Sequence, residues 1–257
     1  DNEEADATAV TKHVPTYIPA GASKQTVSTT ADTLLLLTEG APNSVYAYRF
    51  HWRGTEKLQS SWSRWDFSDA AVVQTVEFLK DRAVFVIAYP DGTYLCDMDL
   101  SEGQQDEGET FVYRLDRKVK ESGCVVSYNA AADRTSVTLP YIPSDPSKVV
   151  VVTRTGSAAN AGVTQSIESV AGAVVEVVGD LSSVTFYAGE RYTFSYEFNR
   201  PTLKRQARTG GLATVTGGRL QIDKWYLSYA DTGYFDVEVK LPEVSAPAAP
   251  SGPEAAS

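Results

Sequence analysis

The sequence predicts an all-β protein, and two observations carry that prediction. Segments in which aromatic or β-branched residues alternate with other residues recur along the chain, and clusters of Gly, Asn, Asp or Pro separate most of them. The composition agrees, because the 257 residues include 14 Tyr, 18 Gly and 12 Pro but a single Met. Many short strands with little helix between them are typical of all-β chains.

The clearest strand is Ser44–Trp52, in which Tyr46, Tyr48, Phe50 and Trp52 share one face. Four aromatic residues at a period of two are a strong strand signal, because successive side chains of a strand point to opposite faces. The segment is therefore expected to present one aromatic face.

The next segments predict a hairpin. Asp69–Lys80 fits either a helix or a strand, because its valines and phenylalanine suit both. Arg82–Tyr89 is a strand that ends at the turn Pro90-Asp91-Gly92, and Thr93–Met98 resumes as a strand. Further strands are expected at Cys124–Tyr128, Ser136–Tyr141, Lys148–Arg154, Ala173–Val178, Arg191–Asn199, Arg219–Tyr229 and Tyr234–Leu241.

A change of composition at Pro140–Pro146 predicts a domain boundary. We expect a flexible start at residues 1–12, an aromatic-rich domain at 13–140, a second β domain at 141–241 and a disordered Pro/Ala/Ser/Gly-rich tail at 242–257. The chain begins at Asp1 with no apolar signal segment after it, so we expect a piece of a longer protein.

Acidic residues at the two ends of the chain contribute part of the net charge of −10. Setting aside six terminal acids leaves about −4 for the body; these acids are Asp1, Glu3, Glu4, Asp6, Glu243 and Glu254. A general DNA-binding surface needs clustered positive charge, so this balance argues against one. It leaves open a surface that DNA passes without binding.

The chain is poor in residues for catalysis. His13 and His51 lack a second His or a Cys at metal-ligand spacing, and Cys96 and Cys124 are expected to be free thiols that are buried or half-buried. Nucleophile elbows, phosphate loops and dinucleotide fingerprints are missing from the sequence. We expect no catalytic residues, no cofactor and no metal.

If the chain has a catalytic site, the acidic segment Asp97–Glu109 is the best place for it, because Asp97 and Asp99 share one strand face. Paired carboxylates can hydrolyse a glycosidic bond or bind a cation. A solvated hairpin loop is the favoured interpretation. The alternative function is therefore to act on, or to bind, surface polysaccharide.

The positive charge gathers in the connection Asn199–Arg208, which contains Arg200, Lys204, Arg205 and Arg208. Such a loop is either a subunit or partner contact or a connection kept soluble by its charge. We favour the contact.

Two separated groups of motifs carry a resemblance to a known family. The first group is Val14-Pro15, Tyr17-Ile18-Pro19, the YAYRFHW strand, Glu56–Phe67 (EKLQSSWSRWDF) and the hairpin that leads into Tyr94-Leu95. The second is Arg191–Phe198, Gly218–Ile222 and Tyr229–Phe235. In this order they resemble the tail nozzle (tail tubular protein B) family of short-tailed, podovirus-type bacteriophages, over about residues 13–241.

The resemblance implies a structural, non-enzymatic role. Nozzle proteins form a ring of six at the distal end of the tail, below an adaptor tail protein, where they enclose the DNA-ejection channel and help to hold the tail fibres. It also implies a propeller-like N-terminal portion followed by a β-sandwich-like portion. The expected location is the virion tail, assembled in the host cytoplasm, with DNA passing transiently and without specific binding, and without membrane insertion.

Within these motifs the residues favour packing over chemistry. Trp62 and Trp65 are three residues apart, which would place them on opposite faces of a strand, one toward the core. A pair of tryptophans for sugar stacking is the functional alternative. Asp231, Gly233 and Tyr234 belong to a predicted hairpin turn between two long strands.

Overall fold

The computed structural model describes residues 9–12, 14–54, 56–101, 106, 108–109, 111–156, 160–198, 204–206, 212–214, 223–224, 226–228 and 236–239. The chain divides into two compact units, Asp1–Ser195 and Tyr196–Ser257. Regular structure in the described residues is strand apart from two short 3₁₀ turns, Glu121–Gly123 and Pro146–Lys148. The all-β prediction is confirmed.

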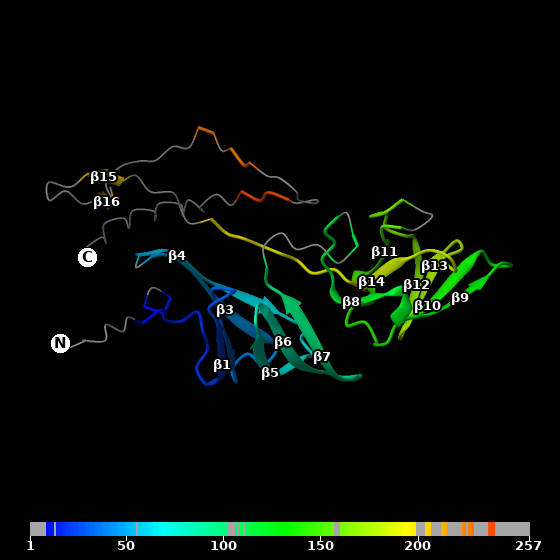
Figure 1. Cartoon of the computed structure of the whole chain (residues 1–257), viewed down its shortest axis with the longest axis horizontal. Coiled ribbons are helices and arrows are strands. Elements are labelled where there is room, and N and C mark those ends of the chain that lie inside the picture. Colours follow the sequence, from blue (N-terminus) through cyan, green and yellow to red (C-terminus); the bar gives the residue numbers. More distant parts are fainter. Residues whose placement is uncertain are drawn as a thin grey trace, which may run out of the picture. The chain divides into compact units, whose positions relative to one another are not determined.

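The first module of unit 1, β1 to β7, consists of two antiparallel sheets (Figure 1). One sheet has the order β1-β2-β3-β4 and the other the order β5-β6-β7. Leu35 and Val45 from the first sheet, and Val76 and Phe85 from the second, are buried in one hydrophobic cluster, so the sheets pack face to face. The strands are Ala22–Ser28 (β1), Thr33–Thr38 (β2), Ser44–Arg53 (β3), Glu56–Asp66 (β4), Val72–Leu79 (β5), Arg82–Tyr89 (β6) and Gly92–Asp99 (β7).

The second module, β8 to β14, repeats this arrangement with different strands. Its sheets have the orders β12-β13-β10-β9 and β11-β14-β8. Val137 and Val175 from one sheet, and Val151 and Phe186 from the other, share a buried cluster. The strands are Asp116–Lys120 (β8), Val125–Asn129 (β9), Arg134–Thr138 (β10), Val149–Thr153 (β11), Ile167–Ala171 (β12), Val174–Val178 (β13) and Phe186–Glu190 (β14).

The predicted hairpin is confirmed. β6 and β7 pair from Arg82↔Asp99 to Tyr89↔Gly92, with Pro90 and Asp91 in the turn. The segment Asp69–Lys80 contains strand β5 and no helix, and its Val73 and Val76 face the core. The expected propeller-like portion is not found: every sheet among the described residues is open, and the sheets of the first module pack in a pair around one core.

In the second module, strands that precede residue 140 pair with strands that follow it. Strands β9 and β10 precede it, but β10 pairs with β13 and β8 pairs with β14. The segment Arg191–Asn199, expected as a strand, is extended from Arg191 to Phe198 and has no sheet partner among the described residues.

In unit 2, the short strands β15 (Lys204–Gln206) and β16 (Leu212–Thr214) pair antiparallel. About half of the residues in the expected strands Arg219–Tyr229 and Tyr234–Leu241 lie outside the described residues, and the described ones do not belong to a strand. Residues 1–8 and the expected tail at 242–257 also lie outside them.

Candidate assembly surfaces

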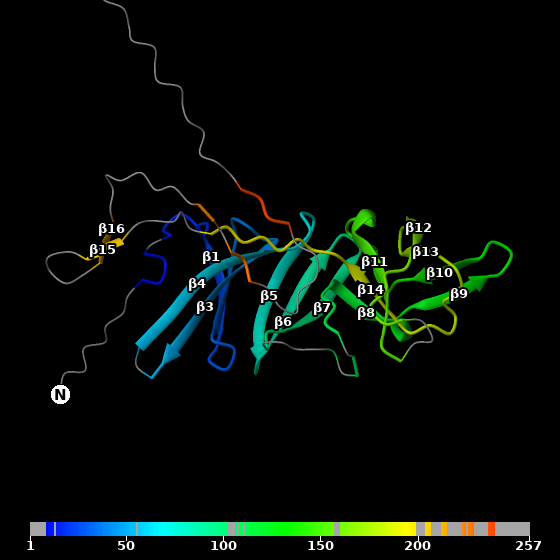
Figure 2. The same cartoon turned by 90° about the horizontal axis from the view of Figure 1, so that it is seen from above.

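The β3–β4 hairpin carries the aromatic face that the sequence predicts. The two strands pair over their whole length, and Figure 2 shows them as the long hairpin of the first module. Tyr48 lies opposite Trp62, and their ring centroids are 5.0 Å apart. Phe50 follows on the same face, 5.9 Å from Tyr48. The stacked rings stabilise the pairing of the hairpin.

The N-terminal segment covers the inner half of this aromatic face. The ring of Tyr17 meets the ring of Tyr46 edge-on, with centroids 5.8 Å apart. The Trp62 indole Nε1 donates a hydrogen bond of 3.1 Å to the carbonyl oxygen of Val10. As a result Tyr46 and Tyr48 are buried, although they face away from the core of the module.

The outer half of the hairpin is open to solvent. Trp52 is 50% exposed and Leu58 is 49% exposed, close to the turn at Gly54. Large apolar side chains that keep about half of their surface in solvent can bury that surface against a partner. This hairpin tip, defined by Trp52 and Leu58, is the first candidate assembly surface.

The two motif tryptophans lie on opposite faces of β4. Trp65 packs against the core of the first module, whereas Trp62 stacks on Tyr48. Both rings therefore pack against other residues of the module. Asp231, Gly233 and Tyr234 lie outside the described residues.

The second candidate surface is the extended segment Arg191–Phe198. It continues β14, which is held on both sides by β11 and β8 as far as Glu190. The Arg191 N–H still donates to the carbonyl of Lys148, at 2.9 Å. The aromatic residues at every second position beyond it are largely exposed: Tyr192 47%, Phe194 80%, Tyr196 68% and Phe198 55%. Aromatic residues at every second position, in a segment with no sheet partner among the described residues, are the pattern of a strand that can add to the edge of another sheet.

The predicted basic loop is described only in part. Lys204 and Arg205 belong to β15, and Arg205 is exposed. Arg200 and Arg208 lie outside the described residues. A contact role for this loop stays a prediction.

The acidic pair Asp97 and Asp99 is bound by one arginine. Arg82 on the neighbouring strand forms ion pairs with both carboxylates, and its Nη1 lies 3.3 Å from Asp99 Oδ2. Asp99 also accepts hydrogen bonds from the backbone and hydroxyl of Ser101. Arg82 offsets one of the two negative charges, and its ion pairs hold both carboxylates in place, which is the environment of a structural ion-pair cluster.

Histidine and cysteine add no further chemistry within the described residues. His51 is exposed, with its Nδ1 4.0 Å from Asp32 Oδ2, and His13 lies outside the described part of the chain. Cys96 and Cys124 are free thiols, as predicted, and burial raises the pKa of both. A search of the described residues finds no group of three or more potential metal ligands.

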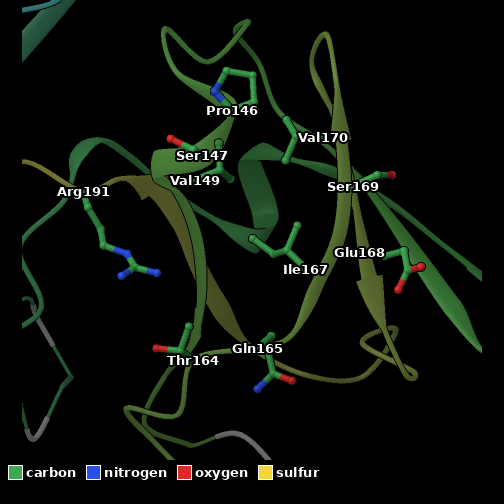
Figure 3. A pocket seen from close by; sticks show the side chains of 10 residues that line it. All are labelled: Pro146, Ser147, Val149, Thr164, Gln165, Ile167, Glu168, Ser169, Val170 and Arg191. Carbon is green, nitrogen blue, oxygen red and sulfur yellow. The ribbon is translucent and has the colours of Figure 1, made fainter.

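A hollow of about 480 Å³ opens between β11 and β12, the edge strands of the two sheets of the second module. Figure 3 shows Ile167 and Arg191 reaching into this hollow, while Glu168 points away from it. Glu168 instead pairs with Arg134 at 3.3 Å. The hollow thus contains an apolar wall and one cation, without an acid and base placed to act together.

The hydrophobic segments of the described residues are strands. None of these residues belongs to a helix with the length and apolar character that crossing a bilayer requires.

Comparison with known proteins gives one consistent result. The family described as bacteriophage nozzle protein matches residues 1–249 of the chain. The chain is also 27% identical over 239 residues to tail tubular protein gp12 of Escherichia phage T7. That alignment covers 90% of this chain and 30% of the phage T7 protein, so the chain spans about a third of the length of this relative. The chain belongs to the bacteriophage nozzle protein family.

Proposed function

We propose that this chain is part of a structural subunit of a phage tail nozzle, the ring through which DNA leaves the virion. The observation that carries the proposal is the family match over residues 1–249. In this proposal six copies form the ring, an adaptor tail protein lies above it and tail fibres attach outside. The subunit acts by contact in the virion tail, after assembly in the host cytoplasm, and it is not an enzyme.

Two structural features support a role in assembly. The hairpin tip at Trp52 and Leu58 and the aromatic face of Arg191–Phe198 expose large apolar side chains outside the cores of the modules. Exposed aromatic residues are enriched where protein surfaces meet, and extended segments pair readily with sheet edges. The β-sandwich-like portion expected at residues 141–241 belongs to this proposal, whereas the propeller-like portion does not, because every sheet among the described residues is open.

The net charge of −10 supports passage of DNA without binding. A surface that held DNA would release counterions on contact, and its affinity would fall steeply with salt concentration. We expect no retention of double-stranded DNA by the chain at physiological ionic strength. Salt-dependent binding of DNA would contradict this part of the proposal.

The experiment that tests the ring is electron microscopy of the purified chain at high concentration, alone and with the adaptor protein of the same phage. Rings with a central hole are the expected result. Monomers that persist in sedimentation velocity under both conditions would contradict the proposal. A parallel assay for sugar release from host polysaccharide should show no activity; release that Asp97→Asn abolishes would contradict the non-enzymatic role.

A further inference from the structure

The two modules of unit 1 meet at the turn between β6 and β7. The Asp91 carboxylate in this turn accepts hydrogen bonds from the Tyr94 hydroxyl and from the backbone N–H of Ile142, both at 2.7 Å. Ile142 follows β10 and belongs to the second module, so this one side chain bridges the two.

The tyrosines that flank the turn are joined to different cores. Tyr89 packs against the hydrophobic cluster of the first module, and Tyr94 packs against that of the second. Their rings meet edge-on, with centroids 5.9 Å apart. The turn is therefore anchored in both modules at once.

Arg117 of β8 fills the space between these groups. Its guanidinium carbon lies 3.9 Å from the ring centroid of Tyr141, 4.2 Å from that of Tyr89 and 4.8 Å from that of Tyr94. Three cation–π contacts to one arginine, whose side chain is only 6% exposed, form an aromatic cage.

Three oxygen atoms complete this Arg117 cage. Nη1 of Arg117 donates to the carbonyl oxygen of Ile142 at 2.9 Å and lies 3.7 Å from Glu190 Oε1. Nη2 donates to Asp91 Oδ2 at 3.4 Å. Asp91 comes from the first module, whereas Ile142 and Glu190 come from the second. A planar guanidinium can serve several such acceptors together, which an ammonium group cannot do as well.

The backbone of β8 is distorted in a way that directs Arg117 into the cage. Asp116 pairs with Glu190 and Val119 pairs with Ala188, so two residues, Arg117 and Lys118, lie opposite Gly189. Arg117 has a positive φ of 49°. This is a β-bulge with an arginine in a left-handed position that glycine normally occupies. Such strain persists only where the surroundings hold it.

We propose that the Arg117 cage is a latch that couples the two modules, so that they unfold and move as one body. Removal of the latch leaves both cores intact, because each module has its own hydrophobic cluster. The modules then unfold separately. This coupling is independent of whether the chain assembles into a ring.

The test is calorimetry and limited proteolysis of the full chain with two variants. Arg117→Gly suits the left-handed backbone, so it removes the side chain from the cage without adding backbone strain. Asp91→Ala removes the bridge from the turn of the first module, away from the core of the second. For both variants we expect the single calorimetric transition of unit 1 to split into two, with faster protease cleavage between the modules.

Lys80→Gly is the matched control, because Lys80 also has a positive φ, 61°, in the turn between β5 and β6. This control should keep one transition. Two transitions in the unaltered chain would overturn the proposal. So would a single transition, with equal calorimetric and van't Hoff enthalpies, in both variants. If Arg117→Gly fails to fold, Asp91→Ala alone tests the proposal: two transitions support it, and one transition overturns it.

Discussion

Tyr48 and Trp62 stand opposite each other across the β3–β4 hairpin, with their ring planes tilted by 43°. The pair lies where the hairpin leaves the body of the first module. On one side of it Tyr46 is covered by Tyr17 of the N-terminal segment, and on the other side Trp52 is open to solvent. The hairpin thus changes from a packed element to a projecting one at this pair.

Replacing Trp62 by Leu should release the N-terminal segment from the hairpin. The change removes the stack on Tyr48 and the hydrogen bond to the carbonyl of Val10. We expect a loss of roughly 1–3 kcal/mol in the free energy of unfolding. Urea titration measures this loss, and proteolysis should cut first within residues 9–19. Equal protection of that segment in the variant would show that Trp62 does not hold it.

The hairpin tip should matter for assembly and not for folding. The double change Trp52→Ser with Leu58→Ser removes two exposed apolar side chains, so the melting temperature should stay nearly constant. Ring or complex formation, followed by sedimentation velocity, should weaken at least tenfold if the tip lies in an interface. Leu95→Ser is the control, since Leu95 is 77% exposed on β7. If the control variant weakens assembly equally, the hairpin tip is not a specific interface.

The basic loop can be tested by reversing its charge. The double change Lys204→Glu with Arg205→Glu should abolish assembly while the isolated fold survives, if the loop joins subunits or partners. Lys80→Glu with Lys120→Glu makes the same change in net charge at two exposed positions of unit 1. If the variant with reversed charge assembles as the unaltered chain does, the loop is not a subunit or partner contact.

Glu109 should stabilise the protein at neutral pH and lose this effect in acid. Burial opposes its ionisation, but hydrogen bonds from the Thr155 N–H and from Arg154 prevail and lower the pKa of Glu109. A carboxyl group whose folded pKa lies below its unfolded value contributes stability above the unfolded pKa, and the contribution disappears as the pH falls through the folded pKa. Glu109→Gln should therefore destabilise the protein at pH 7 and flatten its acid denaturation curve.

Asp116 should show the opposite dependence. Burial, with the nearby Glu190 charge, raises the pKa of Asp116 above its ordinary value. Its stabilising effect is complete below the unfolded pKa and is lost as the pH rises through the folded pKa. Asp116→Asn should reduce the loss of stability between about pH 4 and pH 7. Thermal melts across this range measure both variants, and parallel curves for the variant and the unaltered chain would contradict the expectation.

Gly189→Ala should disrupt the bulge that positions Arg117. An added Cβ would lie 2.9 Å from the carbonyl oxygen of Asp116 and 2.9 Å from the Cβ of Leu115, closer than such atoms approach. We expect destabilisation of about 1–3 kcal/mol, measured by urea titration. Gly123→Ala is the control, because Gly123 is outside the left-handed region and the atom nearest to an added Cβ, Val119 Cβ, lies 4.0 Å away.

The sequence predicts some elements well because their signals are local. Alternation in Ser44–Trp52 and the turn Pro90-Asp91-Gly92 are sufficient to predict β3 and the β6–β7 hairpin. β14 was missed because its sequence, FYAGE, neither alternates nor forms an unbroken apolar run, since it contains a glycine and a glutamate. β8 was missed because it is short, charged and bulged. Which strands pair across residue 140 depends on tertiary packing, which a single sequence does not display.

The candidate surfaces were only partly predictable for the same reason. The aromatic pattern of Tyr46 to Trp52 is visible in the sequence, but its division into a covered and an open half depends on where the N-terminal segment packs. Arg117 carries no signal in the sequence. Its role depends on a bulge opposite Gly189 and on rings from segments far apart in the chain.

β14 lies between β11 and β8 and then runs on as the extended segment Arg191–Phe198. Asp116 at the start of β8 lies opposite Glu190, where this segment leaves β14, and β8 follows the first module along the chain. Tension between the first module and this segment therefore pulls β8 and β14 apart from their common end, so that their hydrogen bonds break one after another. In single-molecule stretching, we expect this pair to open at about the force that unzips a hairpin from its end, and a much higher rupture force would contradict this.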